Sequence, residues 1–145
     1  MRSQPAVVET IKAYCRLFAA EAVDVVAAAQ RFGMHILDDK QLSVSFTPRD
    51  RGFAHGIAVR KWRTNDLGSI DLDVEPTFKL PFSTLRDAFG PFQFVPRFHP
   101  GDDYEFDTAW HPPDSKSSCR LVVTLGAKTR HPTGREPVQR VSIGR

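Results

Sequence analysis

The sequence predicts an α+β fold: a long N-terminal helix packed on one antiparallel sheet of five to six strands, with a short helix between two three-strand halves. Three observations indicate this fold. An apolar stripe of helical period covers about residues 5–32, six segments alternate apolar with polar residues, and a helical segment bounded by Pro and Gly separates these into two groups of three. Because 145 residues is a common size for one domain, residues 1–145 are expected to form a single domain.

The first helix is predicted by apolar residues that recur at spacings of three and four. Pro5 suits a first helical turn, and Gly33 suits the left-handed position just past a helix end. The pattern fits one long helix or two shorter helices in succession. In either case Phe18 and Val25 lie in the middle of the stripe and are expected to face the core.

The strands are predicted by alternation and by the turn residues that separate them. Short connections favour antiparallel neighbours, and the short helix is expected after Ser83, a good N-cap residue. Residues 91–102 are expected to be loop, and residues 128–137, which include no large apolar residue, are expected to form a mobile connection. The predicted strands cover about residues 42–47, 53–62, 69–75, 104–110, 119–125 and 139–143.

The two cysteines, Cys15 and Cys119, both lie in apolar segments, so the sequence predicts buried thiols in preference to a disulfide. Residues 1–5 lack the apolar run of a signal peptide, and no stretch reaches the ~20 apolar residues of a membrane span. A cytoplasmic protein without membrane association is therefore expected.

The net charge of +3 is unevenly distributed along the chain. Residues 127–145 carry five basic residues and one acid, whereas the first 126 residues carry fifteen basic and sixteen acidic residues. The pI near 9.1 is therefore a property of the C-terminal segment, where no aromatic residue interleaves with the cations. The sequence does not favour nucleic acid as a partner.

Carboxylates alternate with apolar residues in the predicted strands 69–75 and 104–110. If the apolar residues face the helix, six carboxylates share the open face of the sheet, where Arg60 and Lys61 of a neighbouring strand could neutralise some of them. We interpret this face either as solvated surface or as an acidic recognition surface for a basic protein. The candidate partner-binding residues are Asp71, Asp73, Glu75, Asp103, Glu105 and Asp107.

No motif points to a specific chemistry. The histidines and carboxylates between His99 and His111 are metal-ligand types, but their spacing matches no established site, so no metal or cofactor is predicted. The chain contains no Walker loop, no Gly-x-Gly-x-x-Gly, no Gly-x-Ser-x-Gly and no Cys-x-x-Cys. These observations make an enzyme the less favoured interpretation, and no catalytic residue is predicted.

The leading hypothesis is a non-catalytic protein-binding module that occludes its partner, and the architecture is similar to that of immunity and chaperone-like proteins. Phe92, Phe94 and Phe98 would add an apolar rim to its binding surface. The alternative is a small-molecule-binding protein or enzyme with a pocket between helix and sheet. A filled helix–sheet interface favours the first hypothesis, and a deep cavity there favours the second. The pattern does not indicate an oligomeric state.

Overall fold

The structure is a computed structural model that describes residues 4–19, 34–38, 43–48, 54–62, 66–74, 78–96, 104–113, 115 and 117–144. Side chains are described for residues 7–16, for Phe18, and for the described residues from Ser69 onward. Within these limits the chain forms two helices and eight strands.

The described elements follow one another as a helix, four strands, a second helix and four more strands. All eight strands belong to one sheet of order β1-β2-β3-β4-β8-β7-β6-β5, and each neighbouring pair is antiparallel. The predicted α+β class with an antiparallel sheet is therefore confirmed. The elements are α1 (Gln4–Ala19), β1 (Met34–Asp38), β2 (Ser43–Pro48), β3 (Ala54–Trp62), β4 (Asp66–Val74), α3 (Phe82–Phe89), β5 (Gln93–Val95), β6 (Glu105–Trp110), β7 (Cys119–Leu125) and β8 (Val138–Gly144).

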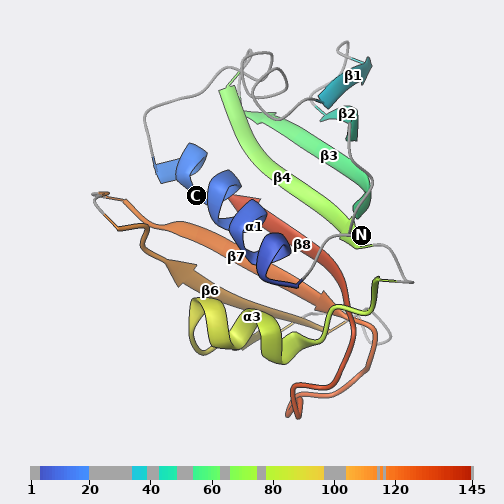
Figure 1. The fold of residues 1–145 in the computed structure, drawn as a ribbon, viewed down its shortest axis with the longest axis vertical. Helices are drawn as coiled ribbons and strands as arrows, with labels where there is room; N and C mark the ends of the chain where they lie inside the picture. Colours follow the sequence, from blue (N-terminus) through green and yellow to red (C-terminus); the bar gives the residue numbers. More distant parts are fainter. Residues whose placement is uncertain are drawn as a thin grey trace.

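Both described helices cover the same face of the sheet, with α1 over β7 and β8 and with α3 beside α1 near β6 (Figure 1). The core is the layer between these helices and strands β4, β6, β7 and β8. The predicted apolar stripe faces this layer as far as the described helix extends. Its buried residues are Val7, Val8, Ile11, Tyr14, Cys15 and Phe18.

The predicted long helix over residues 5–32 is not supported. Helix α1 has 16 residues and ends at Ala19, and residues 20–33, including Val25, lie outside the described residues. Helix α3 begins at Phe82, and Ser83 does not cap it. The backbone N–H groups of Phe82 and Ser83 instead donate to the carbonyl oxygens of Glu136 and Gly134, at 3.0 and 2.9 Å. A distant loop thus satisfies donors that a local N-cap side chain would otherwise satisfy.

The predicted count of five to six strands is wrong, because the described sheet has eight. Strand β1 was not predicted, and β5 lies inside the segment that was expected to be loop. The short helix therefore separates two groups of four strands and not two of three. Strands β4, β8, β7, β6 and β5 form the five-stranded part of the sheet whose side chains are described.

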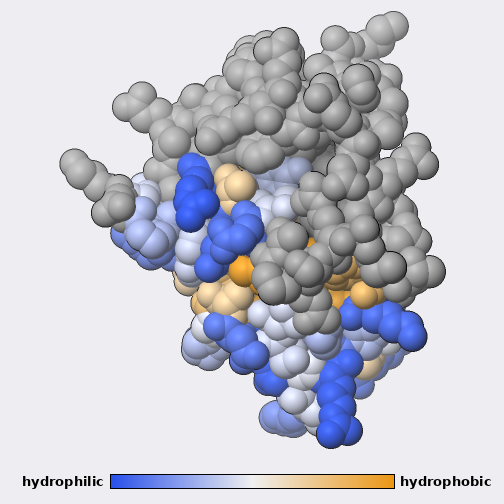
Figure 2. Space-filling view, in the orientation of Figure 1, coloured by the Kyte–Doolittle hydropathy of each residue, from blue (hydrophilic) through white to orange (hydrophobic). Residues whose placement is uncertain are grey.

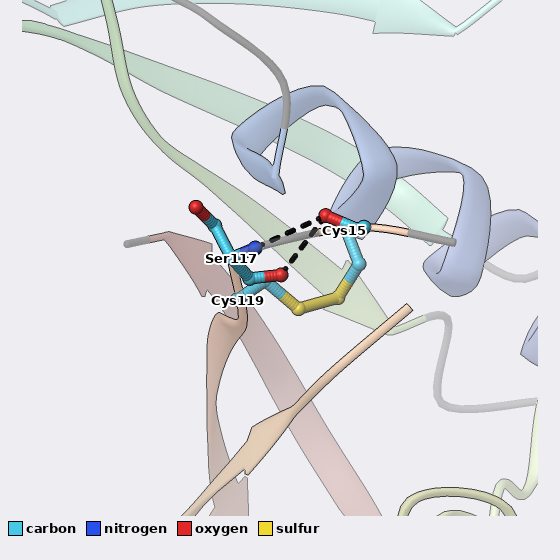
Figure 3. Close-up of a disulfide and its surroundings, with 4 residues drawn as sticks. Cys15, Ser117 and Cys119 are labelled. Atoms are coloured by element: carbon cyan, nitrogen blue, oxygen red, sulfur yellow. Dashed lines mark hydrogen bonds between the residues drawn. A yellow bond between two sulfur atoms is a disulfide. The ribbon is translucent and has the colours of Figure 1, made fainter. Parts of the chain in front are cut away.

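The prediction of two thiols is also wrong. Cys15 and Cys119 are both buried, as expected, but they form a disulfide with Cα atoms 5.5 Å apart. Figure 3 shows this bond joining α1 to the start of β7, with Ser117 beside it. Because disulfides persist mainly in oxidising compartments, one of the observations behind the prediction of a cytoplasmic protein no longer holds, and the compartment stays a prediction.

The connection between β7 and β8, predicted to be mobile, is hydrogen-bonded to the rest of the molecule. Besides the two bonds at the start of α3, the N–H of Gly126 donates to the carbonyl oxygen of Pro137 at 2.9 Å. The N–H of Val138 donates to the carbonyl oxygen of Leu80 at 2.8 Å. The connection is therefore attached to the rest of the fold by hydrogen bonds and not by burial of apolar side chains.

Candidate functional site

The candidate site is the face of strands β4 to β8 that points away from α1 and α3, which we call the open face. In β4, Ile70 and Leu72 are buried beneath the helices, whereas Asp71 and Asp73 alternate with them and remain partly exposed. The same alternation runs through β7 and β6. Two rows of residues cross this face in register: Asp73, Arg140, Thr124, Glu105 and Val95, and Asp71, Ser142, Val122, Asp107 and Gln93.

The structure places four of the six candidate carboxylates on the open face. Asp71 and Asp73 lie on β4, and Glu105 and Asp107 lie on β6. Glu75 and Asp103 lie outside the described residues. The two acidic strands are not neighbours, because β8 and β7 lie between them. The carboxylates therefore form two separate groups on the face and not one acidic cluster.

Two arginines on the intervening strands pair with two of these carboxylates. The Nε of Arg140 donates to Oδ1 of Asp73 at 2.7 Å. The Nε and Nη2 of Arg120 both donate to Oδ2 of Asp107, at 3.1 and 2.8 Å. Neither arginine was predicted to be part of the site, although each occupies an outward position of an alternating strand. The side chains of Arg60 and Lys61, which were expected to neutralise the acids, lie outside the described residues.

The open face is therefore a mixed-charge surface with an acidic excess. Among the described side chains of β4 to β8 it carries four carboxylates and two arginines, a net charge of −2. The arginines are about half exposed (51 % for Arg120 and 52 % for Arg140), and Asp107 and Asp73 are 28 % and 38 % exposed. Ion pairs this exposed contribute only about 0–1 kcal/mol, so their groups can exchange partners at little cost.

A shallow hollow of about 470 Å³ lies at the β5 side of the open face. The Asp107–Arg120 ion pair forms part of its wall, together with Gln93 of the neighbouring strand. The hollow is open to solvent and has polar and apolar walls in about equal parts, unlike the enclosed, mostly apolar pockets that usually hold small molecules. Its full lining is Pro91, Gln93, Asp107, Thr108, Ala109, Ser118, Cys119 and Arg120.

The interface between helices and sheet is filled in the described part of the molecule. The buried side chains of α1, α3 and the strands form one continuous apolar cluster. Among the described residues no charged side chain is buried, so no Asp or His reaches into this layer from the part of the chain that is seen. The pocket that the alternative hypothesis requires is thus not formed by these side chains.

The aromatic residues of the predicted loop belong mostly to the core. Phe92 packs edge-on against Phe82 with ring centroids 5.2 Å apart, and Phe94 packs against Phe106 at 5.6 Å. Both phenylalanines are half-buried, so they do not form the exposed rim that was expected, and Phe98 lies outside the described residues. Trp110 closes the end of the core, with its ring 5.5 Å from that of Phe89.

No metal centre is assembled by the described residues, which contain no group of three or more His, Cys, Asp and Glu side chains placed to share an ion. His111 and the acids of β6 are described, whereas His99, Asp102 and Asp103 are not. The expectation that no cofactor binds stays a prediction.

No protein-family model, no curated protein and no solved structure matches the chain. Neither described helix is long and apolar enough to span a bilayer. Function therefore has to be inferred from the chain's own residues.

Proposed function

We propose that the protein is a non-catalytic protein-binding module that presents its open face to a partner with an excess of basic groups. The observation that carries this proposal is the uncovered, mixed-charge face opposite a filled core. The helices leave this face free within the described structure, and its acidic excess favours a cationic partner. Because the existing ion pairs are exposed, a partner's Lys or Arg can replace Arg120 or Arg140 at little energetic cost.

The size of the face supports a transient complex. Five strands spaced about 4.8 Å apart and about seven residues long cover roughly 550 Å². That area corresponds to the small end of specific interfaces, which bury less than about 1,200 Å² in total. A partner recognised mainly by charge over such an area should bind weakly and should dissociate as salt is raised.

A charge-neutralised variant tests this proposal. Asp73→Asn with Asp107→Asn removes two carboxylates from the open face, and Glu9→Gln with Asp87→Asn removes two exposed carboxylates from α1 and α3 as a control of equal charge. Wild type, variant and control are used as bait in lysate of the source cells at low salt, and the retained proteins are identified.

We expect wild type and control to retain one basic protein that the open-face variant loses. High salt should release this protein. If the variant retains the same proteins as wild type, the open face is not the binding surface. If wild type retains nothing at low salt, the protein-binding function itself is refuted.

The alternative of a small-molecule-binding protein or enzyme has no described pocket between helix and sheet to support it. None of the residues that line the hollow beside Asp107 belongs to α1 or α3, so this hollow is not the pocket that the alternative predicts. We therefore propose protein binding alone.

A further inference from the structure

A second polar surface lies where β7 leads into β8, at residues 126–137, which we call the basic loop. Three of its residues are exposed cations, Lys128, Arg130 and Arg135, and the imidazole of His131 is exposed as well. Strongly hydrophilic residues gather at the lower end of the molecule in Figure 2, where Figure 1 places this loop. Its residues follow the end of β7 and precede β8, so none of them lies on a strand of the open face.

The loop is fixed internally by Glu136. Its Oε2 accepts the backbone N–H of Thr133 at 3.0 Å and the Thr133 hydroxyl at 3.2 Å, and its Oε1 accepts the N–H of Gly134 at 2.8 Å. These bonds, led by that from the Thr133 N–H, lower the pKa of Glu136 to about 2. The one carboxylate of the loop is thus ionised but engaged by backbone donors, and it is not paired with the loop's own cations.

The loop is also fixed to helix α3. Arg86 donates from Nη2 to the carbonyl oxygen of Thr133 at 3.0 Å and from Nη1 to that of Pro132 at 3.5 Å, while its guanidinium lies 5.2 Å from the Phe82 ring centroid. Gly134 has φ +106°, and a Cβ there would overlap the Arg86 guanidinium. Together with the bonds to the start of α3, these contacts hold the loop in one arrangement. A ligand would therefore bind a preorganised surface and would not have to order the backbone first.

Two cations on this scaffold, Arg130 and Arg135, are available for a ligand. Neither Arg130 nor Arg135 forms an ion pair with a described residue, and both are exposed. Arg130 lies over the ring of Phe94 on β5, with its guanidinium carbon 5.3 Å from the ring centroid. The structure thus supplies from another strand the aromatic neighbour that the C-terminal sequence lacks.

We propose that the basic loop binds the phosphate backbone of nucleic acid without sequence preference, a function separate from partner binding at the open face. Nucleic acid presents closely spaced negative charges, which suit a compact set of exposed cations. The loop has no aliphatic side chain larger than alanine or proline, so it offers little to insert into a bilayer or to fill the apolar core of a protein interface. Electrostatic contact with phosphates is the binding mode that these residues fit.

The test measures binding of the full chain to a fluorescein-labelled single-stranded oligonucleotide by anisotropy, over a series of salt concentrations. With two phosphate contacts, from Arg130 and Arg135, log K should fall against log salt with a slope of about −1.4. The variant Arg130→Gln with Arg135→Gln should bind at least about tenfold more weakly at low salt and lose most of that slope. The control Arg120→Gln with Arg140→Gln removes the same charge from the open face and should keep wild-type affinity and slope. Thermal melts check that both variants remain folded.

Three results would overturn the proposal. The first is the absence of binding by wild type at the lowest salt. The second is a control that loses as much affinity as the loop variant, which would mean attraction by net charge alone. In a parallel assay with anionic phospholipid vesicles, binding to vesicles but not to the oligonucleotide would assign the loop to lipid phosphates instead. Because the open-face test uses other residues, failure here leaves the protein-binding proposal unaffected.

Discussion

Replacement of both Cys15 and Cys119 by alanine should remove a large part of the protein's free energy of unfolding. The two residues are 104 positions apart, so their bond closes most of the chain into a loop. In the chain-entropy relation a loop of this length gives about 16 cal/mol/K, or about 4.7 kcal/mol at 25 °C, by restricting the unfolded state. A domain of this kind has only about 5–15 kcal/mol in total. Loss of the disulfide should therefore bring the fold close to the limit of stability.

Urea unfolding followed by circular dichroism measures the loss. With an m-value of about 2 kcal/mol/M, the midpoint of the alanine double variant should fall by roughly 2 M. The thermal midpoint should fall by roughly 10–20 °C. The single variants Cys15→Ala and Cys119→Ala are the controls: each already breaks the bond, so each should be nearly as unstable as the double variant.

Two results would refute this reasoning. The first is that each single variant loses little stability and that the two losses add up in the double variant. Additive losses would mean that no bond joins the two positions. The other is the titration of two free thiols in unreduced wild type after unfolding in guanidinium. Either would restore the prediction of two thiols.

Three further predictions follow from the buried stripe and the basic loop. Phe18→Asp should cost at least about 3 kcal/mol, because Phe18 is 3 % exposed in α1; a thermal midpoint within a few degrees of wild type would mean that the stripe does not face the core. Glu136 has its pKa lowered from 4.5 to about 2, so its stabilising contribution is complete above its ordinary pKa and is lost as pH falls towards 2. Glu136→Gln should therefore flatten the dependence of the melting temperature on pH in that window, and an unchanged profile would contradict the loop geometry. Gly134→Ala should cost about 1–3 kcal/mol, because alanine disfavours φ +106° and its Cβ displaces Arg86. It should also speed trypsin cleavage after Arg130 and Arg135, and equal cleavage rates in wild type and variant would show that Arg86 does not hold the loop.

The sequence predicted the strands whose alternation is long enough to be distinguished from chance. Strands β6, β7 and β8 have six or seven residues each and were located within a residue or two of their ends. Strand β5 has three residues, too few for a period of two to be recognised, and its place in the sheet is fixed by pairing with β6. The same limit applies to the five-residue strand β1.

The candidate site was predicted only in part because strand order cannot be read from alternation. The period of two correctly placed Asp71 and Asp107 on the outward side of their strands. The insertion of β8 and β7 between the two acidic strands depends on long-range pairing, so the ion pairs to Arg140 and Arg120 were not predicted. The disulfide was missed for a related reason. Burial of each cysteine follows from its own segment, but their proximity follows from the packing of α1 on β7.

The two polar surfaces differ in whether their arginines are paired with carboxylates, and this difference decides what each surface can bind. On the open face, Arg120 and Arg140 lie against carboxylates, so a ligand must exchange an existing ion pair and gains only a small net energy at each one. In the basic loop the carboxylate of Glu136 is held by backbone N–H groups, which leaves Arg130 and Arg135 without an ionic partner among the described residues. The loop can therefore gain new charge pairs with phosphates, whereas the open face must recognise its partner by the pattern of several charges together. A soluble polyanion such as heparin should accordingly compete with the oligonucleotide for the loop.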